Sequence, residues 1–297
     1  MGERVTHRRK GPIALAAAVM CVLPFAAPAG ASNSAEPSSS SQPLTVGTVH
    51  ALMAQADPVH VGDGKSVLAK GDMVFFKADI VWEESVLKEH HGKKAADGSC
   101  VFTIPFESPA HQDVVIQERE LARDNGTCVV VTEEGETTLQ AVREEDARRG
   151  DEPLELPTAT TSGHAPAASS GAWHRARHQD PLYLTVNSVT NMVRWSYSGS
   201  CVTSSTHDRN YFYLSSTGWN LESISTSPGR SCGSAWTYVT AKFYNGSFCI
   251  SNPTTRVSYH PNRIIGYPNG TYSGSATYTA TGGCSSWLDY NAQHGNY

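Results

Sequence analysis

The sequence predicts an α+β N-terminal unit followed by an all-β C-terminal unit, the latter an antiparallel β-sandwich or barrel with disulfides. Residues 44–148 hold 10 Lys and Arg against 19 Asp and Glu, whereas residues 179–297 hold 6 against 4 and contain all 12 tyrosines. Such a change in charge and aromatic content favours two folding units. The stretch between them, residues 149–178, is rich in Pro, Ala, Ser and Thr and predicts a flexible linker.

The N-terminus has the pattern of a bacterial secretory signal peptide. Residues 1–31 contain a basic segment, an apolar run over 13–27 and a small-residue cleavage site at Ala29-Gly30-Ala31. The apolar run is shorter than the roughly 20 residues that span a bilayer. We therefore expect a secreted, extracellular protein with no membrane anchor in the mature chain. Residues 32–43 are Ser-rich and predict a disordered stretch.

Residues 44–148 predict a small acidic domain with mixed structure. Runs of β-branched and aromatic residues predict strands over 73–80, 100–106, 113–123 and 128–132. Asn125-Gly126 has the residue types that a tight hairpin turn requires between the last two strands. The spacing of apolar residues predicts helices over 83–90 and 137–148.

Residues 179–297 predict an aromatic-rich β domain. Short runs of Val, Thr, Tyr, Trp and Phe predict strands over 182–186, 192–197, 211–214, 219–224, 235–244, 255–259, 263–267 and 271–281. Asn245-Gly246 and Asn269-Gly270 lie between successive runs and predict hairpin turns. The number and small size of the strands favour a sandwich or a barrel.

Six cysteines remain after the predicted signal peptide, and an even number in an exported chain predicts disulfides. Cys100 and Cys128 are the only two in the N-terminal unit, so they are expected to pair. The C-terminal unit holds four, which allow three pairings: Cys201, Cys232, Cys249 and Cys284. We favour sequential pairing because nearer partners close smaller loops.

Composition and motifs argue against several function classes. The formal net charge of −5 argues against a nucleic-acid partner. The sequence has no zinc-protease, P-loop, dinucleotide-binding or EF-hand motif, so no cofactor and no metal site are expected. His174 and His178 have the spacing of a metal-binding pair on a helix, but they lie in the predicted linker beside two arginines that repel a cation.

Two arrangements would support a secreted hydrolase. His207, Asp208 and His260 are among the few ionisable groups of the C-terminal unit and are candidates for general acid–base catalysis. Residues 229–233 match the G-x-S-x-G nucleophile pattern, with Asp289 and His294 after them. That pattern needs a strand before it and a helix after it, whereas here Pro228 precedes and a predicted strand follows.

The aromatic residues favour a non-catalytic binding module instead. A tyrosine or tryptophan ring can stack on a sugar or anchor a protein partner, and its polar atom can make a hydrogen bond. Core packing is the alternative role for the same residues. The candidates for a binding face are Trp195, Trp219, Trp236, Tyr211 and Tyr213. We therefore predict a secreted surface-interaction protein that binds an extracellular glycan or protein, with the acidic unit as a separable partner or pro-region. No oligomeric state is predicted.

Four runs in the C-terminal unit, YSGSC at 197–201, FYNGSFC at 243–249, HPNRIIGY at 260–267 and GGCSSWLDY at 282–290, resemble an uncharacterised family of secreted bacterial two-domain proteins. ELARDNGTCVVVTEEGE at 120–136 is similar to the preceding region of the same family. The resemblance covers most of residues 100–297. It implies secretion and a two-part layout, and it implies no activity, cofactor or site residue.

Overall fold

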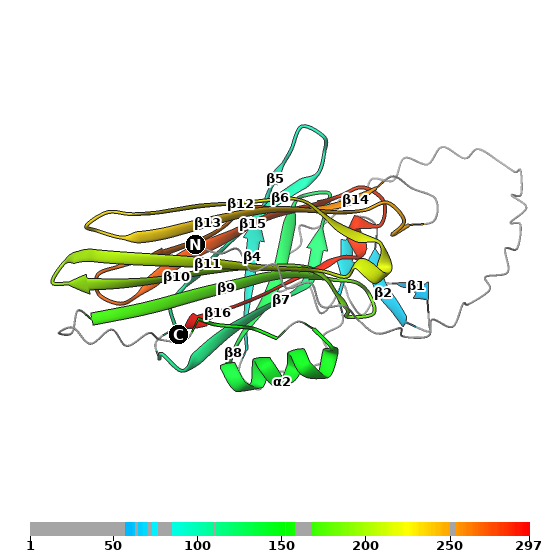
Figure 1. The fold of residues 1–297 in the computed structure, drawn as a ribbon. Helices are drawn as coiled ribbons and strands as arrows, with labels where there is room; N and C mark the ends of the chain where they lie inside the picture. The colour runs from blue at the N-terminus through cyan, green and yellow to red at the C-terminus, as the bar shows by residue number, and fades with distance from the viewer. Residues whose placement is uncertain are drawn as a thin grey trace, which may run out of the picture. The chain divides into compact units, whose positions relative to one another are not determined.

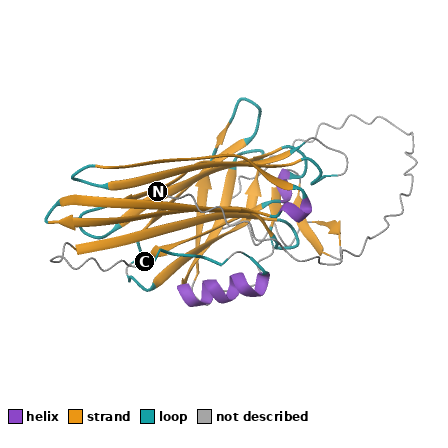
Figure 2. Ribbon diagram, viewed as in Figure 1, coloured by secondary structure: helices purple, strands orange, loops and turns teal. Residues whose placement is uncertain are grey.

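The computed structural model describes residues 57–62, 65–70, 73–76, 85–109, 111–151, 153–157, 168–249 and 254–297. Residues 42–297 form one compact unit. The predicted signal peptide (1–31) and the Ser-rich stretch (32–43) lie outside the described residues. Strands dominate the described chain, with a single α-helix of three turns, α2 (Leu139–Arg149) (Figure 2).

Two antiparallel sheets make up the fold. Ten-stranded sheet I has the order β1 (Asp57–Gly62), β2 (Lys65–Lys70), β3 (Met73–Phe75), β7 (Val114–Asp124), β16 (Asp289–Asn296), β9 (Ala168–Gln179), β10 (Thr185–Ser198), β11 (Cys201–Tyr213); β8 (Val129–Thr138) also pairs with β7 and carries β4 (Ser85–His91). Six-stranded sheet II has the order β12 (Trp219–Arg230), β13 (Ala235–Asn245), β14 (Thr255–Gly266), β15 (Tyr272–Thr281), β6 (Cys100–Glu107), β5 (Lys93–Lys94). Two short 3-10 turns, η1 (Ser215–Thr217) and η2 (Ser285–Trp287), connect strands.

The sheets stack face to face, as Figure 1 shows for β12, β13 and β15 over β9, β10, β11 and β16. Alternate residues of each strand point between the sheets and form the main core. Sheet II contributes Val239, Phe243, Tyr259 and Tyr278, and sheet I contributes Ala176, Val189 and Tyr290. The predicted β-sandwich-like architecture with disulfides is therefore confirmed, whereas a separate α+β N-terminal unit is not seen.

The structure differs from the predicted division into two units because strands from both halves share both sheets. β6 pairs with β15, and β16 lies between β7 and β9. A strand completes its backbone hydrogen bonds with whichever neighbour the fold supplies, however distant in sequence. Composition along the chain does not reveal such pairing, so the change near residues 149–178 marks no boundary in the described structure.

Much of the predicted linker is part of sheet I. β9 occupies residues 168–179 and pairs with β16 on one side and β10 on the other. Residues 172–179 of β9 are all buried. Residues 158–167 lie outside the described residues. The linker prediction is therefore wrong for β9. Its charged and polar side chains are buried on both faces of the strand, because other parts of the chain neutralise them or pack against them.

The helix predicted over 83–90 is wrong, because β4 occupies Ser85–His91 and pairs with β8. Cross-strand contacts hold it there: the Lys88 ammonium lies 2.6 Å from a Glu134 carboxylate oxygen, and His90 Nε2 lies 3.2 Å from Glu118 Oε1. The helix predicted over 137–148 is confirmed as α2. Thr138 caps its start by accepting a hydrogen bond from the Ala141 amide, and Gly150 ends it at a left-handed φ of 72°.

Most of the other predicted elements are confirmed with changed bounds. The strands over 100–106, 113–123 and 128–132 become β6, β7 and β8, and the strands over 255–259 and 263–267 are one strand, β14. The run over 73–80 yields β3, and residues 77–80 lie outside the described residues. Asn269-Gly270 forms the predicted turn, where the Gly270 amide donates to the Tyr267 carbonyl. β16 was not predicted.

Three disulfides join Cys100 to Cys128, Cys201 to Cys232 and Cys249 to Cys284, which is the sequential pairing. They indicate that the protein folds in an oxidising environment. Among the described helices, none has the length and apolar character that crossing a bilayer demands.

Candidate functional site

The predicted acid–base residues do not converge. His207 and Asp208 are exposed neighbours on β11, and successive side chains of a strand point to opposite faces of the sheet. His260 lies on β14 in the other sheet, where register shifts interrupt the pairing with both β13 and β15. Burial and the nearby Lys242 ammonium lower the pKa of His260.

The G-x-S-x-G pattern also fails as a catalytic arrangement. Ser231 is exposed in the turn between β12 and β13. Asp289 and His294 are buried on β16, and their odd separation places them on opposite faces of sheet I. Burial raises the pKa of Asp289 to about 7, and the Asn291 amide donates a hydrogen bond to its carboxylate. No nucleophile–base pair is formed by these residues.

Three histidines lie between the two sheets as part of the core. His174 stacks on Phe106 with ring centroids 4.2 Å apart, His178 Nδ1 lies 2.8 Å from the Tyr259 hydroxyl, and His294 Nδ1 lies 2.9 Å from the Tyr272 hydroxyl. Burial lowers the pKa of His174 to about 3 and lowers those of His178 and His294 well below their usual value. These histidines are therefore neutral core residues that do not reach solvent.

The metal-binding alternative is not supported by the described residues. His174 and His178 lie on one face of a strand, not on a helix, and both point into the core. Within the described ranges no three His, Cys, Asp or Glu side chains gather closely enough to hold a metal ion.

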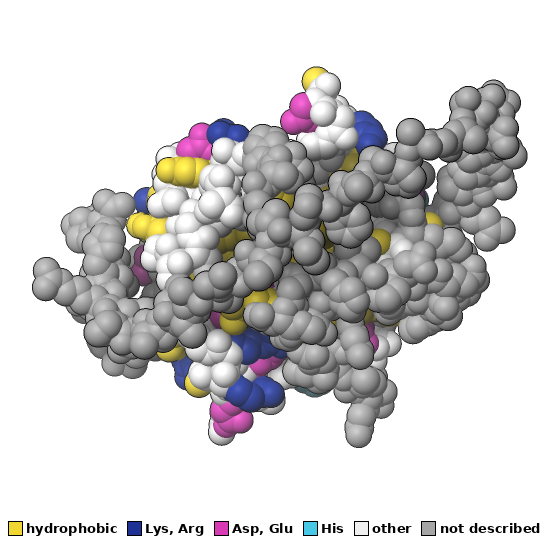
Figure 3. All heavy atoms as spheres, turned by 90° about the vertical axis from the view of Figure 1, so that its right-hand side faces the viewer, with side chains coloured by type: hydrophobic (Ala, Val, Ile, Leu, Met, Phe, Trp, Pro, Cys, Tyr) yellow, Lys and Arg dark blue, Asp and Glu magenta, His cyan; other side chains and the backbone are white. Residues whose placement is uncertain are grey.

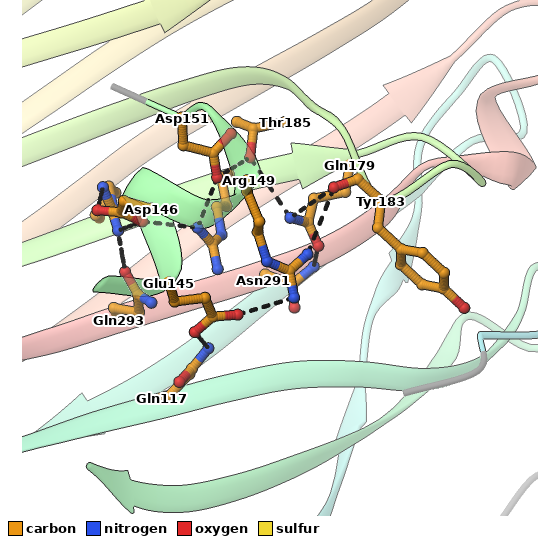
Figure 4. A network of polar contacts seen from close by, with 12 residues as sticks. Gln117, Glu145, Asp146, Arg149, Asp151, Gln179, Tyr183, Thr185, Asn291 and Gln293 are labelled. Carbon is orange, nitrogen blue, oxygen red and sulfur yellow. Dashed lines mark hydrogen bonds and ion pairs between the residues drawn. The ribbon is translucent and has the colours of Figure 1, made fainter. Parts of the chain in front are cut away.

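A second buried cluster fastens α2 to the outward face of sheet I (Figure 4). Both terminal nitrogens of Arg175 donate to the Asp146 carboxylate, at 2.7 and 2.8 Å, and the same guanidinium also donates to Gln293. Arg177 Nη1 lies 3.5 Å from Asp146 and 3.4 Å from Asp151. Asp146 is fully buried. The cluster neutralises its own charges and serves to attach the helix.

A small hollow lies beside this cluster, between the segment that follows α2 and strands β9, β10 and β11. Its lining includes Glu155, Arg175, Thr190 and Asn210, and it has room for about one water molecule. Organic ligands occupy pockets of several hundred Å³. On the solvent side of α2, Arg143, Glu144 and Arg148 are exposed, and Figure 3 shows acidic and basic side chains together at the level of the helix. The exposed side of α2 therefore carries charges of both signs.

The predicted aromatic candidates separate into core and surface residues. Trp195 and Trp219 are 1% and 0% exposed, and the Trp195 indole nitrogen donates to the Tyr267 carbonyl. Tyr211 and Tyr213 are partly buried and pack against the main core. Only Trp236 of the five points outward from sheet II, so it is the one candidate that lies on an outward face.

Trp236 belongs to a row of outward side chains along β13. The strand alternates strictly: Val239, Ala241 and Phe243 are buried, whereas the even-numbered residues are half-buried or exposed. Trp236, Tyr238 and Tyr244 are the aromatic members, which we call the aromatic row. The sequence contained the signal for Tyr238 and Tyr244, because they share the parity of Trp236 in a strand whose other face is apolar.

The strands beside the aromatic row supply hydroxyl groups on the same face. Ser227 of β12 pairs with Tyr238 on one side. Arg263 of β14 pairs with Tyr238 on the other side, and Ser275 of β15 pairs in turn with Arg263. Thr103 and Thr277 share a hydrogen bond of 3.0 Å further along the face. The other outward hydroxyls are those of Ser223, Ser225, Thr240, Ser258, Ser273 and Thr281. The face is thus polar and rich in hydrogen-bonding groups around three rings.

A glycine sets the position of the Trp236 ring. Gly229 of β12 lies directly opposite Trp236, and a Cβ at this position would lie 2.4 Å from Trp236 Cζ2. The indole therefore lies flat over the glycine backbone. Any larger residue at position 229 would lift the ring from the sheet.

No protein-family model, curated protein or solved structure matches this chain.

Proposed function

We propose that this chain is a secreted, non-catalytic binding protein and that the outward face of sheet II binds an extracellular polysaccharide. The observation that carries the proposal is the aromatic row. Trp236, Tyr238 and Tyr244 lie on one face of one strand, and Tyr244 is 36% exposed. Rings that lie at the surface can stack on sugar rings, while their hydroxyl and indole groups remain free to donate hydrogen bonds.

The shape of the face favours a polymer over a small molecule. Tyr244 lies eight positions after Trp236, which corresponds to about 27 Å along an extended strand. A face of this length makes few contacts with a single sugar but several with a chain that runs along β13. Serine and threonine hydroxyls on β12, β14 and β15 would bind the sugar hydroxyls at both sides of the rings.

Two further observations support the binding function over the hydrolase alternative. The candidate catalytic side chains, His207, Asp208 and His260, lie on different faces and different sheets. The disulfides and the predicted signal peptide agree with an extracellular location, where polysaccharides are available as partners.

The proposal is tested by affinity electrophoresis and pull-down of the full mature chain over a panel of soluble polysaccharides and cell-wall preparations. We expect retention on at least one, and a loss of affinity of at least tenfold in the Trp236→Ala/Tyr238→Ala double variant. Leu184→Ala is the matched control, because Leu184 is 39% exposed but lies immediately before β10, outside sheet II. Absence of retention on every preparation, or equal retention of the double variant, would refute the proposal.

A further inference from the structure

The outward face of sheet II carries a group of cations around the aromatic row. Lys242 lies four positions after Tyr238 on β13 and therefore on the same face. Arg263 pairs with Tyr238, and Arg256 pairs with Tyr244. The two arginines are exposed and Lys242 is half-buried. Residues 179–297 contain six Lys and Arg in all, so half of them lie on this one face. The complete chain is acidic, with a net charge of −5, which makes the face electrostatically distinct.

These cations are only partly neutralised. Glu222 lies 3.8 Å from Arg256, with both side chains about half exposed. The Arg263 guanidinium lies over the Tyr238 ring, 5.4 Å from its centroid. Within the described residues neither Lys242 nor Arg263 forms an ion pair. The face therefore retains positive charge beside the rings that stack on the ligand.

We propose that the polysaccharide is an acidic one whose sugar units carry carboxylate groups, as in a polymer of uronic acids. This inference rests on the proposed function. A uronic acid carries in one unit the ring that stacks on an aromatic side chain and the anion that binds a neighbouring cation. The planar fork of an arginine matches a carboxylate with two parallel hydrogen bonds. The face presents ring and cation side by side at Tyr238 with Arg263 and at Tyr244 with Arg256.

The test compares polygalacturonate with the same polymer after methyl esterification, which removes the charge but keeps the sugar backbone. We expect the full mature chain to bind polygalacturonate at least tenfold more tightly than the ester at low salt. Raising the salt to about 0.5 M should remove most of this preference, because the contacts lie at the surface and are screened.

Two variants separate the contributions of charge and ring. Lys242→Gln/Arg263→Gln should reduce the preference for polygalacturonate over its methyl ester several-fold, with Arg256 left to supply the remaining preference. Tyr238→Ala should weaken binding to both polymers. Arg143→Gln, an exposed arginine on α2, is the matched control and should bind as the unaltered chain does.

Three outcomes would overturn this inference without ambiguity. Equal binding of the acid and its ester would refute the acidic ligand but leave the polysaccharide function intact. Equal or tighter binding to dextran sulfate, with no effect of Tyr238→Ala, would show charge attraction without carboxylate recognition. Absence of binding to both polymers, together with retention on a neutral glycan of the wider panel, would also refute it, whereas no retention anywhere would refute the proposed function itself.

Discussion

The outward faces of the two sheets carry similar side chains in different surroundings. On sheet I, Trp173, Arg175 and Arg177 of β9 are buried beneath α2 and the segment that follows it, and the arginines are paired with Asp146. On sheet II, the equivalent mixture of Trp236, Tyr238 and Arg263 is half-buried or exposed. Arginine and aromatic residues on a strand therefore do not by themselves indicate a binding face.

The difference follows from whether the protein itself supplies ion-pair and hydrogen-bond partners for the charged side chains of each face. A buried arginine requires a carboxylate and further hydrogen bonds to offset its desolvation, and α2 supplies both through Asp146. The cations of sheet II retain their hydration and need no internal partner. We infer that the covered face contributes to the fold, whereas the open face contributes to binding.

The largest expected effect comes from breaking the covered face. Asp146→Ala leaves Arg175 and Arg177 buried without their shared carboxylate and should lower the free energy of unfolding by about 3–5 kcal/mol. Urea denaturation followed by circular dichroism measures this change. The neighbouring Glu144→Ala, which removes an exposed carboxylate, should change it by less than about 0.5 kcal/mol. Comparable effects in the two variants would contradict the structural role of the cluster.

The second prediction concerns the layer between the sheets, where protonation should destabilise the fold. His174 contacts Phe106, and His294 contacts Tyr272. The ring of His178 is surrounded by three tyrosines, Tyr259, Tyr278 and Tyr290. The positive charge of Arg123 also lowers the pKa of His178. The pKa values of all three histidines are lowered by burial, so the folded chain resists protonation that the unfolded chain accepts below pH 6.5. The contribution of these histidines to the free energy of unfolding is therefore fully present above pH 6.5 and is lost as the pH falls below that value.

Two buried acids oppose this effect. The pKa of Asp289 is raised to about 7 and that of Glu120 is also raised by burial, so the folded chain takes up protons there first. We expect a net difference of about one to two protons, or roughly 1.4–2.7 kcal/mol per pH unit below pH 6. Urea denaturation at several pH values measures this slope. His294→Gln should reduce it by about one proton, whereas the exposed His207→Gln should leave it unchanged; an unaltered slope in His294→Gln would contradict the assignment.

A smaller effect should follow from disturbing the open face beneath its tryptophan. Gly229→Ala places a methyl group where Trp236 lies, so the indole must tilt away from the sheet. We expect a loss of about 1 kcal/mol in stability and a loss of several-fold in polysaccharide affinity. Gly233→Ala is the matched control, because its Cβ would meet nothing closer than 4.0 Å. Unchanged affinity in Gly229→Ala would separate Trp236 from the binding face.

How much could be predicted from sequence depended on whether a strand's two faces differ in polarity. β13 and β6 alternate between apolar and polar residues, which indicates a strand with one face in the core. β9 and β16 do not: His174, Arg175 and Gln293 are buried among partners from other strands and from α2. Such a polar sequence resembles a linker until those partners are known. For the same reason, the change in composition near β9 resembles a boundary between two units.

The candidate site shows the same limit. Sequence composition identified aromatic residues as the unusual feature but could not separate Trp195 and Trp219, which are buried, from Trp236, which is half-exposed. The sequence alone does not show that Arg256 and Arg263 of β14 lie beside the aromatic row. The register of β14 against β13 places them there.

The central claim is that ligand binds along β13, and it is tested most directly by nuclear magnetic resonance of the aromatic side chains during titration with polygalacturonate. We expect shifts of the Trp236 indole and of the Tyr238 and Tyr244 rings, with the signals of the buried Trp173 and Trp219 unchanged. Shifts confined to residues near α2, or binding that leaves all three ring signals of β13 unmoved, would contradict it.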